Sequence, residues 1–322
     1  TTFTVESDLI VSGGIYRFRY RTMNTNGWSQ FSPITHIKAA TIPQRPPAPV
    51  LYSSTADSIT LSLFETQIDG GEIITEYELF VNQGTTSTDF TKVTTYDGFA
   101  ASHTVTVADD ALVAGTIYKF KYRATNEYGA SEWSEELDAG VSSLPAKATA
   151  VRRILSESTE TQLTLEWDTV ADTELPVIGY TLRINDGVGG SVYTDIFTTK
   201  NPNIRKYIVG NLTTGLTYGF TIEAINFNSN GEASDPALFI VCTAPRGLDP
   251  AEMIDVTSTT MTLEWKAPNH TGGCPVQSYY IFKSEDNVIF TEVDAASVNN
   301  LPALRKYTLT FDGADTGKLF TF

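Results

Sequence analysis

The side chains that could carry out chemistry in this 322-residue sequence are few and widely separated. The three histidines are His36, His103 and His270, and none lies near a cysteine or carboxylate at the spacing typical of metal ligands. The sequence contains no H-E-x-x-H zinc motif, no G-x-S-x-G nucleophile motif and no phosphate-binding P-loop. We therefore predict no catalytic residue, no metal site, no cofactor and no enzymatic activity.

Two acidic clusters and one glycine-rich stretch could bind small ligands. The clusters, Asp69–Glu72 and Asp172–Glu174, carry the oxygen atoms that calcium prefers. Cadherin-like calcium motifs are absent, however, and solvated loop carboxylates are the commoner case. The stretch Asn185–Gly190 (Asn-Asp-Gly-Val-Gly-Gly) is typical of a turn that needs positive φ, and it does not match a dinucleotide-binding fingerprint. We assign no ligand to any of the three.

Two sequons could be modified. Asn211-Leu-Thr213 and Asn269-His-Thr271 both match the acceptor pattern for N-glycosylation. Both fall between predicted strands, where a surface position is expected. We therefore predict Asn211 and Asn269 as glycosylation sites if the protein enters a secretory pathway.

The elements that must position these residues repeat along the chain. One pattern begins at Gly13, Gly115, Gly215 and Gly317, about 100 residues apart, with an aromatic residue three positions after each glycine. A second pattern recurs at the same interval, in Ser58–Phe64, Gln162–Trp167 and Thr260–Trp265. Both alternate apolar with polar residues and are rich in β-branched and aromatic side chains, which predicts half-buried strands. No amphipathic pattern of helix length is present.

The landmarks of this repeat resemble the fibronectin type III family over essentially the whole chain. They are a Trp on the second strand and a Tyr on the third, then Leu, Gly and Tyr leading into Phe, an Ala-x-Asn step, and Gly before Ser. A period of about 100 residues with about seven short strands is also the size of an immunoglobulin-like sandwich. The resemblance implies an all-β fold of tandem seven-stranded sandwiches arranged end to end.

Proline-containing segments divide the chain into four predicted units, because proline is tolerated at the start or edge of a strand. Residues 1–42 are predicted as the C-terminal part of a module, 43–143 and 144–243 as complete modules, and 244–322 as the N-terminal part of another. Half a sandwich exposes apolar edges. We therefore expect further modules on both sides.

The resemblance also implies roles for individual aromatic residues. Tyr16, Tyr118 and Tyr218 are the expected tyrosine-corner residues, each with a buried ring and a hydroxyl that reaches the backbone. Trp167 and Trp265 are expected to fill the module cores. Phe18 and Tyr20, with their equivalents in later repeats, should point inward. Phe64 stands where a core Trp is expected, and Phe320 stands where a corner Tyr is expected.

Trp28 is predicted to stack on arginines of a neighbouring strand. Arg17, Arg19 and Arg21 share one face of that strand, and the segment Trp28–Ser32 is similar to the Trp-Ser-x-Trp-Ser motif of the cytokine-receptor variant of this fold. Phe31 replaces the second Trp, and the disulfides of that variant are missing. We therefore interpret the motif as a stabilising surface ladder.

The two cysteines are predicted to lie at one junction between repeats. Cys242 ends the last strand of one module, and Cys274 lies in the loop between the second and third strands of the next. In this fold that loop is at the pole where the chain enters, so a disulfide is geometrically possible. Two unrelated thiols are the alternative.

The charge of the chain restricts its partners. The net charge of −16 repels phosphate backbones and anionic lipid, which argues against binding to nucleic acid or to a membrane surface. We predict a structural or adhesion spacer in a long extracellular or cell-surface multidomain protein, with other proteins or its own copies as partners. The alternatives are an intracellular scaffold of muscle or cilium type, or accessory modules of an enzyme whose catalytic domain lies elsewhere.

Overall fold

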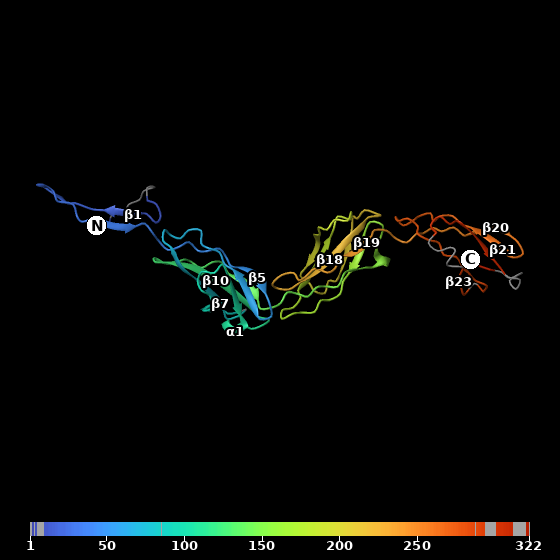
Figure 1. Ribbon diagram of the computed structural model, residues 1–322, viewed down its shortest axis with the longest axis horizontal. Helices are drawn as coiled ribbons and strands as arrows, with labels where there is room; N and C mark the ends of the chain where they lie inside the picture. The colour runs from blue at the N-terminus through green and yellow to red at the C-terminus, as the bar shows by residue number, and fades with distance from the viewer. Residues whose placement is uncertain are drawn as a thin grey trace.

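The computed structural model describes residues 2, 4, 10–84, 86–286, 288–293, 301–311 and 320–321. Figure 1 shows an elongated molecule in which successive groups of strands follow one another along its length. The helical elements among these residues are a single turn, α1 (Val107–Asp110), and the short 3-10 segment Leu155–Glu157. The predicted all-β fold of tandem sandwiches is confirmed.

The N-terminal strands form two small antiparallel pairs. Strand β1 (Ile15–Phe18) pairs with β4 (Thr35–Lys38), and β2 (Met23–Asn24) pairs with β3 (Gly27–Trp28). Among the described residues, no second sheet packs against β1. The predicted inward orientation of Phe18 and Tyr20 is therefore wrong here, since their side chains are 37% and 74% exposed.

The first complete sandwich consists of a three-stranded and a five-stranded sheet. The first sheet contains β5 (Val50–Ser54), β6 (Ser58–Ser62) and β9 (Ser102–Thr106). The second contains β7 (Ile74–Asn82), β8 (Phe90–Lys92), β10 (Ile117–Asn126), β11 (Gly129–Ala130) and β12 (Leu137–Gly140). Alternate residues of β6 and β10 face the core, so Leu61, Phe120 and Tyr122 are fully buried between the sheets. Phe64 lies at the edge of this core and is half-exposed.

The second complete sandwich has seven strands in two sheets. One sheet contains β13 (Arg152–Arg153), β14 (Leu163–Glu166) and β17 (Lys206–Val209). The other contains β15 (Gly179–Ile184), β16 (Thr194–Thr199), β18 (Thr217–Ile225) and β19 (Ala237–Ile240). Trp167 is buried in its core and packs against Tyr180 and Phe197, with ring centroids 5.9 and 6.4 Å away.

The last group of strands comprises a three-stranded sheet and a separate pair. The sheet contains β20 (Glu252–Val256), β21 (Thr260–Glu264) and β24 (Lys306–Thr310), and the pair is β22 (Phe282–Lys283) with β23 (Thr291–Glu292). Trp265, predicted as a core residue, is only half-buried and lines an open pocket with Tyr279. The fourth copy of the glycine-aromatic pattern, residues 317–322, lies mostly outside the described residues.

We propose that the modules begin and end where the sequence predicts. In support, each described sheet contains strands from only one side of every predicted boundary. Modules I, II, III and IV are hereafter residues 1–42, 43–143, 144–243 and 244–322.

The three tyrosine-corner candidates make the same contact. The hydroxyl oxygens of Tyr16, Tyr118 and Tyr218 each accept a hydrogen bond from the backbone N–H five residues upstream, at 2.6, 2.9 and 3.2 Å. Tyr118 and Tyr218 are buried, and Tyr16 is half-buried. Each hydroxyl therefore satisfies a loop amide where the chain turns into a long strand.

Candidate functional site: the joints between modules

In the part of the chain that the structure describes, the residues with catalytic potential lie apart from one another. The described residues include no group of three or more His, Cys, Asp and Glu side chains that could hold a metal ion. His103 Nε2 lies 3.0 Å from Thr95 Oγ1, but the single proton of that hydroxyl is donated to Asp110, so His103 does not receive it as a general base would. Burial lowers the pKa of His103 and favours its neutral form.

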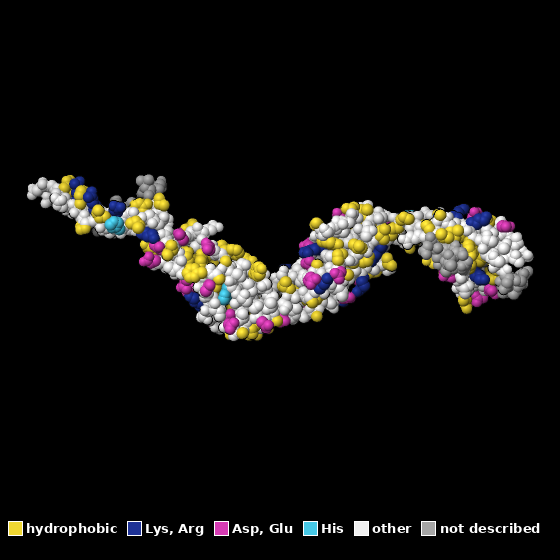
Figure 2. All heavy atoms as spheres, in the orientation of Figure 1, with side chains coloured by type: hydrophobic (Ala, Val, Ile, Leu, Met, Phe, Trp, Pro, Cys, Tyr) yellow, Lys and Arg dark blue, Asp and Glu magenta, His cyan; other side chains and the backbone are white. Residues whose placement is uncertain are grey.

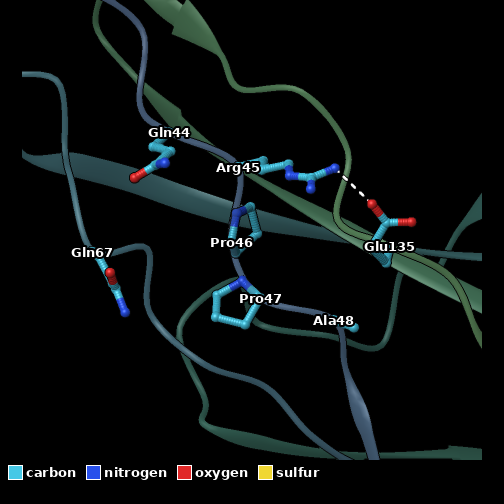
Figure 3. Close-up of a pocket in the computed structure, with 7 residues that line it drawn as sticks. All are labelled: Gln44, Arg45, Pro46, Pro47, Ala48, Gln67 and Glu135. Atoms are coloured by element: carbon cyan, nitrogen blue, oxygen red, sulfur yellow. Dashed lines mark hydrogen bonds and ion pairs between the residues drawn. The ribbon is translucent and has the colours of Figure 1, made fainter.

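A surface depression lies where the chain enters module II (Figure 3). It is lined by Gln44–Ala48, Gln67 and Glu135, and an exposed ion pair crosses it between Arg45 Nη1 and Glu135 Oε1 at 2.7 Å. The depression contains amides, prolines and one ion pair, without a nucleophile beside a base. This arrangement fits a linker lying on a surface better than a catalytic cleft.

The joints between modules are short. At each one, a single residue lies between a backbone N–H that donates within its own module and a backbone N–H that donates to the next module. The first set of donors is Ala39, Val141 and Val241, and the second set is Thr41, Ser143 and Thr243. Thr41 and Thr243 donate to the carbonyls of Gly70 and Gly272, both at 2.9 Å. A one-residue connection leaves few backbone torsions free, so the joints restrict rotation.

A buried asparagine clamps the linker at two of the joints. Asn126 Nδ2 donates to the carbonyl oxygen of Thr41 at 2.8 Å, and Asn226 Nδ2 donates to that of Ser143 at 2.9 Å. The Oδ1 atom of each asparagine accepts a backbone N–H from its own turn, which fixes the amide orientation. The two side chains are 3% and 1% exposed. Modules II and III thus each hold the end of the preceding module with the asparagine of their Ala-x-Asn step.

The joint between modules II and III is closely packed. Ser142 is fully buried, and its hydroxyl accepts the N–H of Leu175 at 3.1 Å. Leu175 lies against Gly140, where an added Cβ would stand 2.3 Å from Leu175 Cδ1. Asn228 binds both the N–H and the carbonyl of Gly140, at 2.7 and 2.8 Å. This joint is therefore an interior contact with little room for rearrangement.

The joint between modules I and II uses a pair of glycines. Gly70 and Gly71 have φ of 81° and 84°, in the left-handed region. A Cβ on Gly71 would stand 2.4 Å from the backbone nitrogen of Gly13, so only glycine permits this approach. Lys38 also forms an ion pair across the joint with Glu72, and this hydrogen bond raises the pKa of Lys38 and lowers that of Glu72.

The two acidic clusters therefore belong to the joints. Glu72 pairs with Lys38, and the Glu174 carboxylate accepts the N–H of Ser143 at 2.8 Å. The carboxylate of Asp172 accepts the N–H of Val177 within module III. These partners account for carboxylates that could otherwise have suggested a calcium site.

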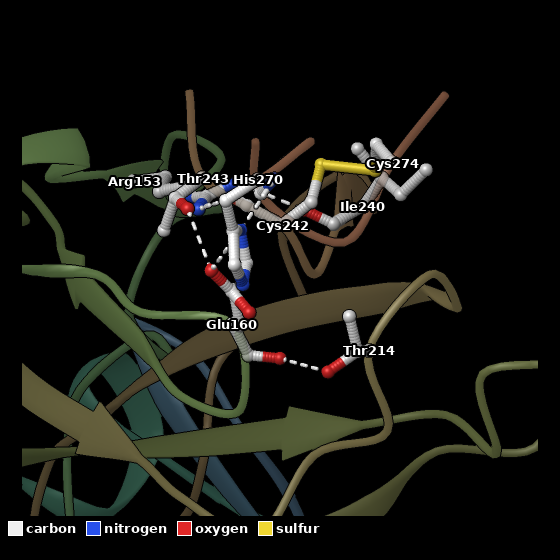
Figure 4. Close-up of a disulfide and its surroundings, with 9 residues drawn as sticks. Arg153, Glu160, Thr214, Ile240, Cys242, Thr243, His270 and Cys274 are labelled. Carbon is white, nitrogen blue, oxygen red and sulfur yellow. Dashed lines mark hydrogen bonds and ion pairs between the residues drawn. A yellow bond between two sulfur atoms is a disulfide. The ribbon is translucent and has the colours of Figure 1, made fainter. Parts of the chain in front are cut away.

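The joint between modules III and IV contains a disulfide (Figure 4). Cys242 and Cys274 are bonded, and their Cα atoms are 5.7 Å apart, within the usual 4.4–6.8 Å. Glu160, in module III, lies beside the bond and faces module IV. Its Oε1 atom is 3.0 Å from Arg246 Nη1 and 3.4 Å from His270 Nδ1. One covalent bond and the ion pair between Glu160 and Arg246 thus connect these modules.

We predict that the contact between Glu174 and Ser143 weakens in acid. The Ser143 N–H holds the pKa of the Glu174 carboxyl below its ordinary value. Its contribution is fully present above the unfolded-state pKa, about 4.3, and is lost as the pH falls through the lower folded-state value. The Ser143 amide proton shift should titrate with a midpoint below about 4.3, and Glu174→Gln should abolish this titration. A midpoint at or above the ordinary value would contradict the assignment.

The predicted surface ladder lies on β1 and the residues that follow it. The guanidinium carbon of Arg21 is 4.2 Å from the Trp28 ring centroid, and that of Arg19 is 3.9 Å from the Phe31 centroid. Arg17 lies opposite His36 in the β1–β4 pair. Module II has a similar arrangement, with Arg123 4.5 Å from the Trp133 centroid. Trp28 is 57% exposed, so these stacks are surface contacts.

Both sequon asparagines are exposed. Asn211 has φ of 58° and precedes the tyrosine corner of module III. Asn269 lies near the III–IV joint, and its backbone N–H donates to the Gly247 carbonyl at 3.0 Å. Thr213 and Thr271, which complete the sequons, are exposed as well.

The clamping role of Asn126 and Asn226 was not predicted from the sequence. Asn126 and Asn226 appeared only as family landmarks, although their repetition could have suggested a shared structural role. Ser142 and Glu160 carry no repeated signal, so only the tertiary structure identifies them as joint residues.

Comparisons with known proteins agree with this architecture. The family model of the fibronectin type III domain matches residues 150–240. The chain is 30% identical over 190 residues to "M-protein, striated muscle" of Gallus gallus, covering 55% of this chain and 12% of that protein. It is 25% identical over 246 residues to "Fibronectin type-III domain-containing protein 3A" of Mus musculus, covering 76% of this chain and 20% of that protein. It is also 25% identical over 284 residues to "Exoglucanase B" of Cellulomonas fimi, covering 81% of this chain and 25% of that protein. The chain therefore spans a quarter or less of the length of these relatives.

Among solved structures, the chicken CNTN1 FN1-FN3 domains match with a TM-score of 0.33 and 18% identity, over 83% of this chain and 88% of that one. No helix in the part of the chain that the structure describes is long and apolar enough to cross a membrane.

The fold and the joints define a tandem array of immunoglobulin-like β-sandwiches. Residues 150–240 match the fibronectin type III family, and the landmarks of that stretch recur in the other modules.

Proposed function

We propose that this chain is a non-catalytic spacer that holds its two ends at a set separation within an extracellular or cell-surface multidomain protein. The observation that carries the proposal is the buried asparagine clamp at two successive one-residue joints. Bending a joint would leave the clamped carbonyl and the buried amide unsatisfied, and each such group costs about 1–3 kcal/mol. Stiffness is therefore built into the joints as well as into the sandwiches.

Partners are proposed to be other proteins or further copies of this chain. Modules of this class generally mediate contacts between proteins. Figure 2 shows acidic and basic side chains interspersed on the visible face of the two central modules. The net charge of −16 keeps such a surface soluble and disfavours phosphate-rich partners.

Two other placements have specific support. The relative from striated muscle, at 30% identity, favours an intracellular scaffold. The relative named as an exoglucanase favours accessory modules beside a catalytic domain. In all three placements this part of the chain supplies spacing and surface, without a bond-making step of its own.

Solution scattering tests the spacer proposal. Modules of roughly 25–35 Å laid end to end should give a maximum dimension on the order of 100 Å and a single elongated shape. A matched variant with eight Gly/Ser residues inserted after Ser143 should give a broader distribution of distances, because the clamp no longer sets the approach of module III. If the unmodified chain already shows the broad distribution of the insertion variant, the spacer proposal is wrong.

Glycan analysis distinguishes the proposed placements. If the protein is secretory, Asn211 or Asn269 should carry a sugar, because both side chains are exposed. Intact-mass measurement of protein from its native source, before and after glycosidase treatment, gives the result. Asn211→Gln and Asn269→Gln assign the site. A protein mass that shows no sugar on either asparagine would favour the intracellular scaffold.

A further inference from the structure

The joint between modules III and IV is the one of the three joints that contains a disulfide. Its ion pair between Glu160 and Arg246 is exposed. The side chains of Arg246 and His270 are 60% and 45% exposed, and that of Glu160 is 27% exposed. Exposed ion pairs contribute little to stability and are screened by salt.

The disulfide stands at the position where the preceding joint has a buried contact. Cys242 occupies the connecting position that Ser142 occupies at the preceding joint, one residue after the last ladder donor. Ser142 links module II to module III through the Leu175 N–H. Cys242 links module III to the Thr271–Pro275 loop of module IV through Cys274. The same position thus carries a hydrogen bond at one joint and a covalent bond at the next.

We propose that the Cys242–Cys274 bond is a redox-operated lock on this joint. The joint is stiff when the cysteines are bonded and becomes a hinge when they are reduced, while the asparagine-clamped joints keep their stiffness under the same conditions. This inference rests on the proposed spacer function, to which it adds a point of regulation.

The geometry is suited to reversible reduction. Both cysteines are half-buried, so neither residue is enclosed in a module core. A dithiol reductant attacks one sulfur as a thiolate and releases the other cysteine as a thiolate. The second thiol of the reductant then displaces the remaining cysteine. Two electrons pass from the dithiol to the two cysteines, and the reductant leaves as a disulfide.

Reduction should release the module IV side of the joint first. Arg153 of module III donates to the carbonyl oxygens of Ile240 and Cys242, which keeps the Cys242 backbone in place. On the other side, the Thr271–Pro275 loop includes Gly272 and Gly273, both at positive φ. After reduction, the Thr243–Gly272 hydrogen bond and the exposed ion pair between Glu160 and Arg246 would remain at the joint. Because an exposed ion pair is weak in solvent, we expect the loop to open when the covalent bond is gone.

Hydrogen exchange on the 322-residue chain tests the lock. In non-reduced protein, alkylation should label neither cysteine, and exchange at Thr243 and Arg246 should be slow because their N–H groups are bonded across or beside the joint. Dithiothreitol should accelerate exchange at both by on the order of tenfold or more. Exchange at Thr41 and Ser143, the equivalent donors of the other joints, should stay unchanged.

Cys242→Ser/Cys274→Ser is the matched control, and it should exchange fast at Thr243 with or without the reductant. Labelling of both cysteines in non-reduced protein would overturn the proposal. So would reduction that leaves exchange at Thr243 within about twofold. The wild-type comparison needs no substitution, so a poorly folded variant does not obscure the result. Scattering tests the spacer at the II–III joint and local exchange tests the lock, so either proposal can fail while the other holds.

Discussion

Replacing Trp167 by alanine is expected to lower the free energy of unfolding of module III by about 3–5 kcal/mol. The indole is 2% exposed and lies between the two sheets of the sandwich, against Tyr180 and Phe197. Its removal loses transfer free energy and leaves a cavity that neighbouring rings fill only in part. Chemical denaturation followed by tyrosine fluorescence or circular dichroism measures the loss.

Two matched substitutions separate this effect from general damage. Trp167→Phe keeps most of the apolar volume and removes an indole N–H that has no hydrogen-bond partner, so its cost should be well below that of alanine. Trp28→Ala removes an exposed indole and should change stability by less than about 1 kcal/mol. A loss below about 1 kcal/mol for Trp167→Ala would show that its strand is placed in the wrong register.

Replacing Asn226 by alanine is expected to destabilise module III by about 1–3 kcal/mol and to loosen its joint with module II. The substitution removes the donor to the Ser143 carbonyl and the acceptor for the Asn228 N–H, at a site that is 1% exposed. Buried backbone groups left without partners keep their full desolvation cost. Hydrogen exchange at Ser143 reports the joint, and denaturation reports the module.

Asn226→Asp distinguishes the clamp from the turn. A carboxylate oxygen still accepts the Asn228 N–H but cannot donate to Ser143, so the joint should loosen while the turn persists. Asn126→Ala should loosen the I–II joint and leave Ser143 unaffected. If Asn226→Ala changes stability but leaves exchange at Ser143 unchanged, the asparagine supports only its own turn and the clamp is refuted.

The fold of this chain was largely predictable, because its signal is local and repeated. Alternation in segments such as Gln162–Trp167 follows directly from the two-residue period of a strand, and the recurrence of such segments identifies the unit. The tyrosine corners could be predicted for the same reason, since Tyr118 and Tyr218 contact amides only five residues away. Short-range geometry of this kind is encoded in short stretches of sequence.

Burial at the ends of the chain was predicted less well. The alternation around Phe18 and Tyr20 assigns both to an inner face, but a face is buried only when a second sheet covers it. Trp265 is half-buried for a related reason, because it lines an open pocket instead of a closed core. Periodicity predicts which side chains share a face, whereas packing decides whether that face is covered.

By itself, the sequence determined the class of the protein, the number and order of its strand groups, and the residues on each strand face. Only the tertiary structure decided how the modules are joined. The clamp between Asn226 and Ser143 connects residues 83 positions apart, and the Glu160–Arg246 pair connects residues 86 positions apart. Such contacts depend on how two separately folded bodies meet, and no local pattern encodes that geometry. The physical reason is that strand formation responds to near neighbours, while a joint responds to the approach of surfaces that fold independently.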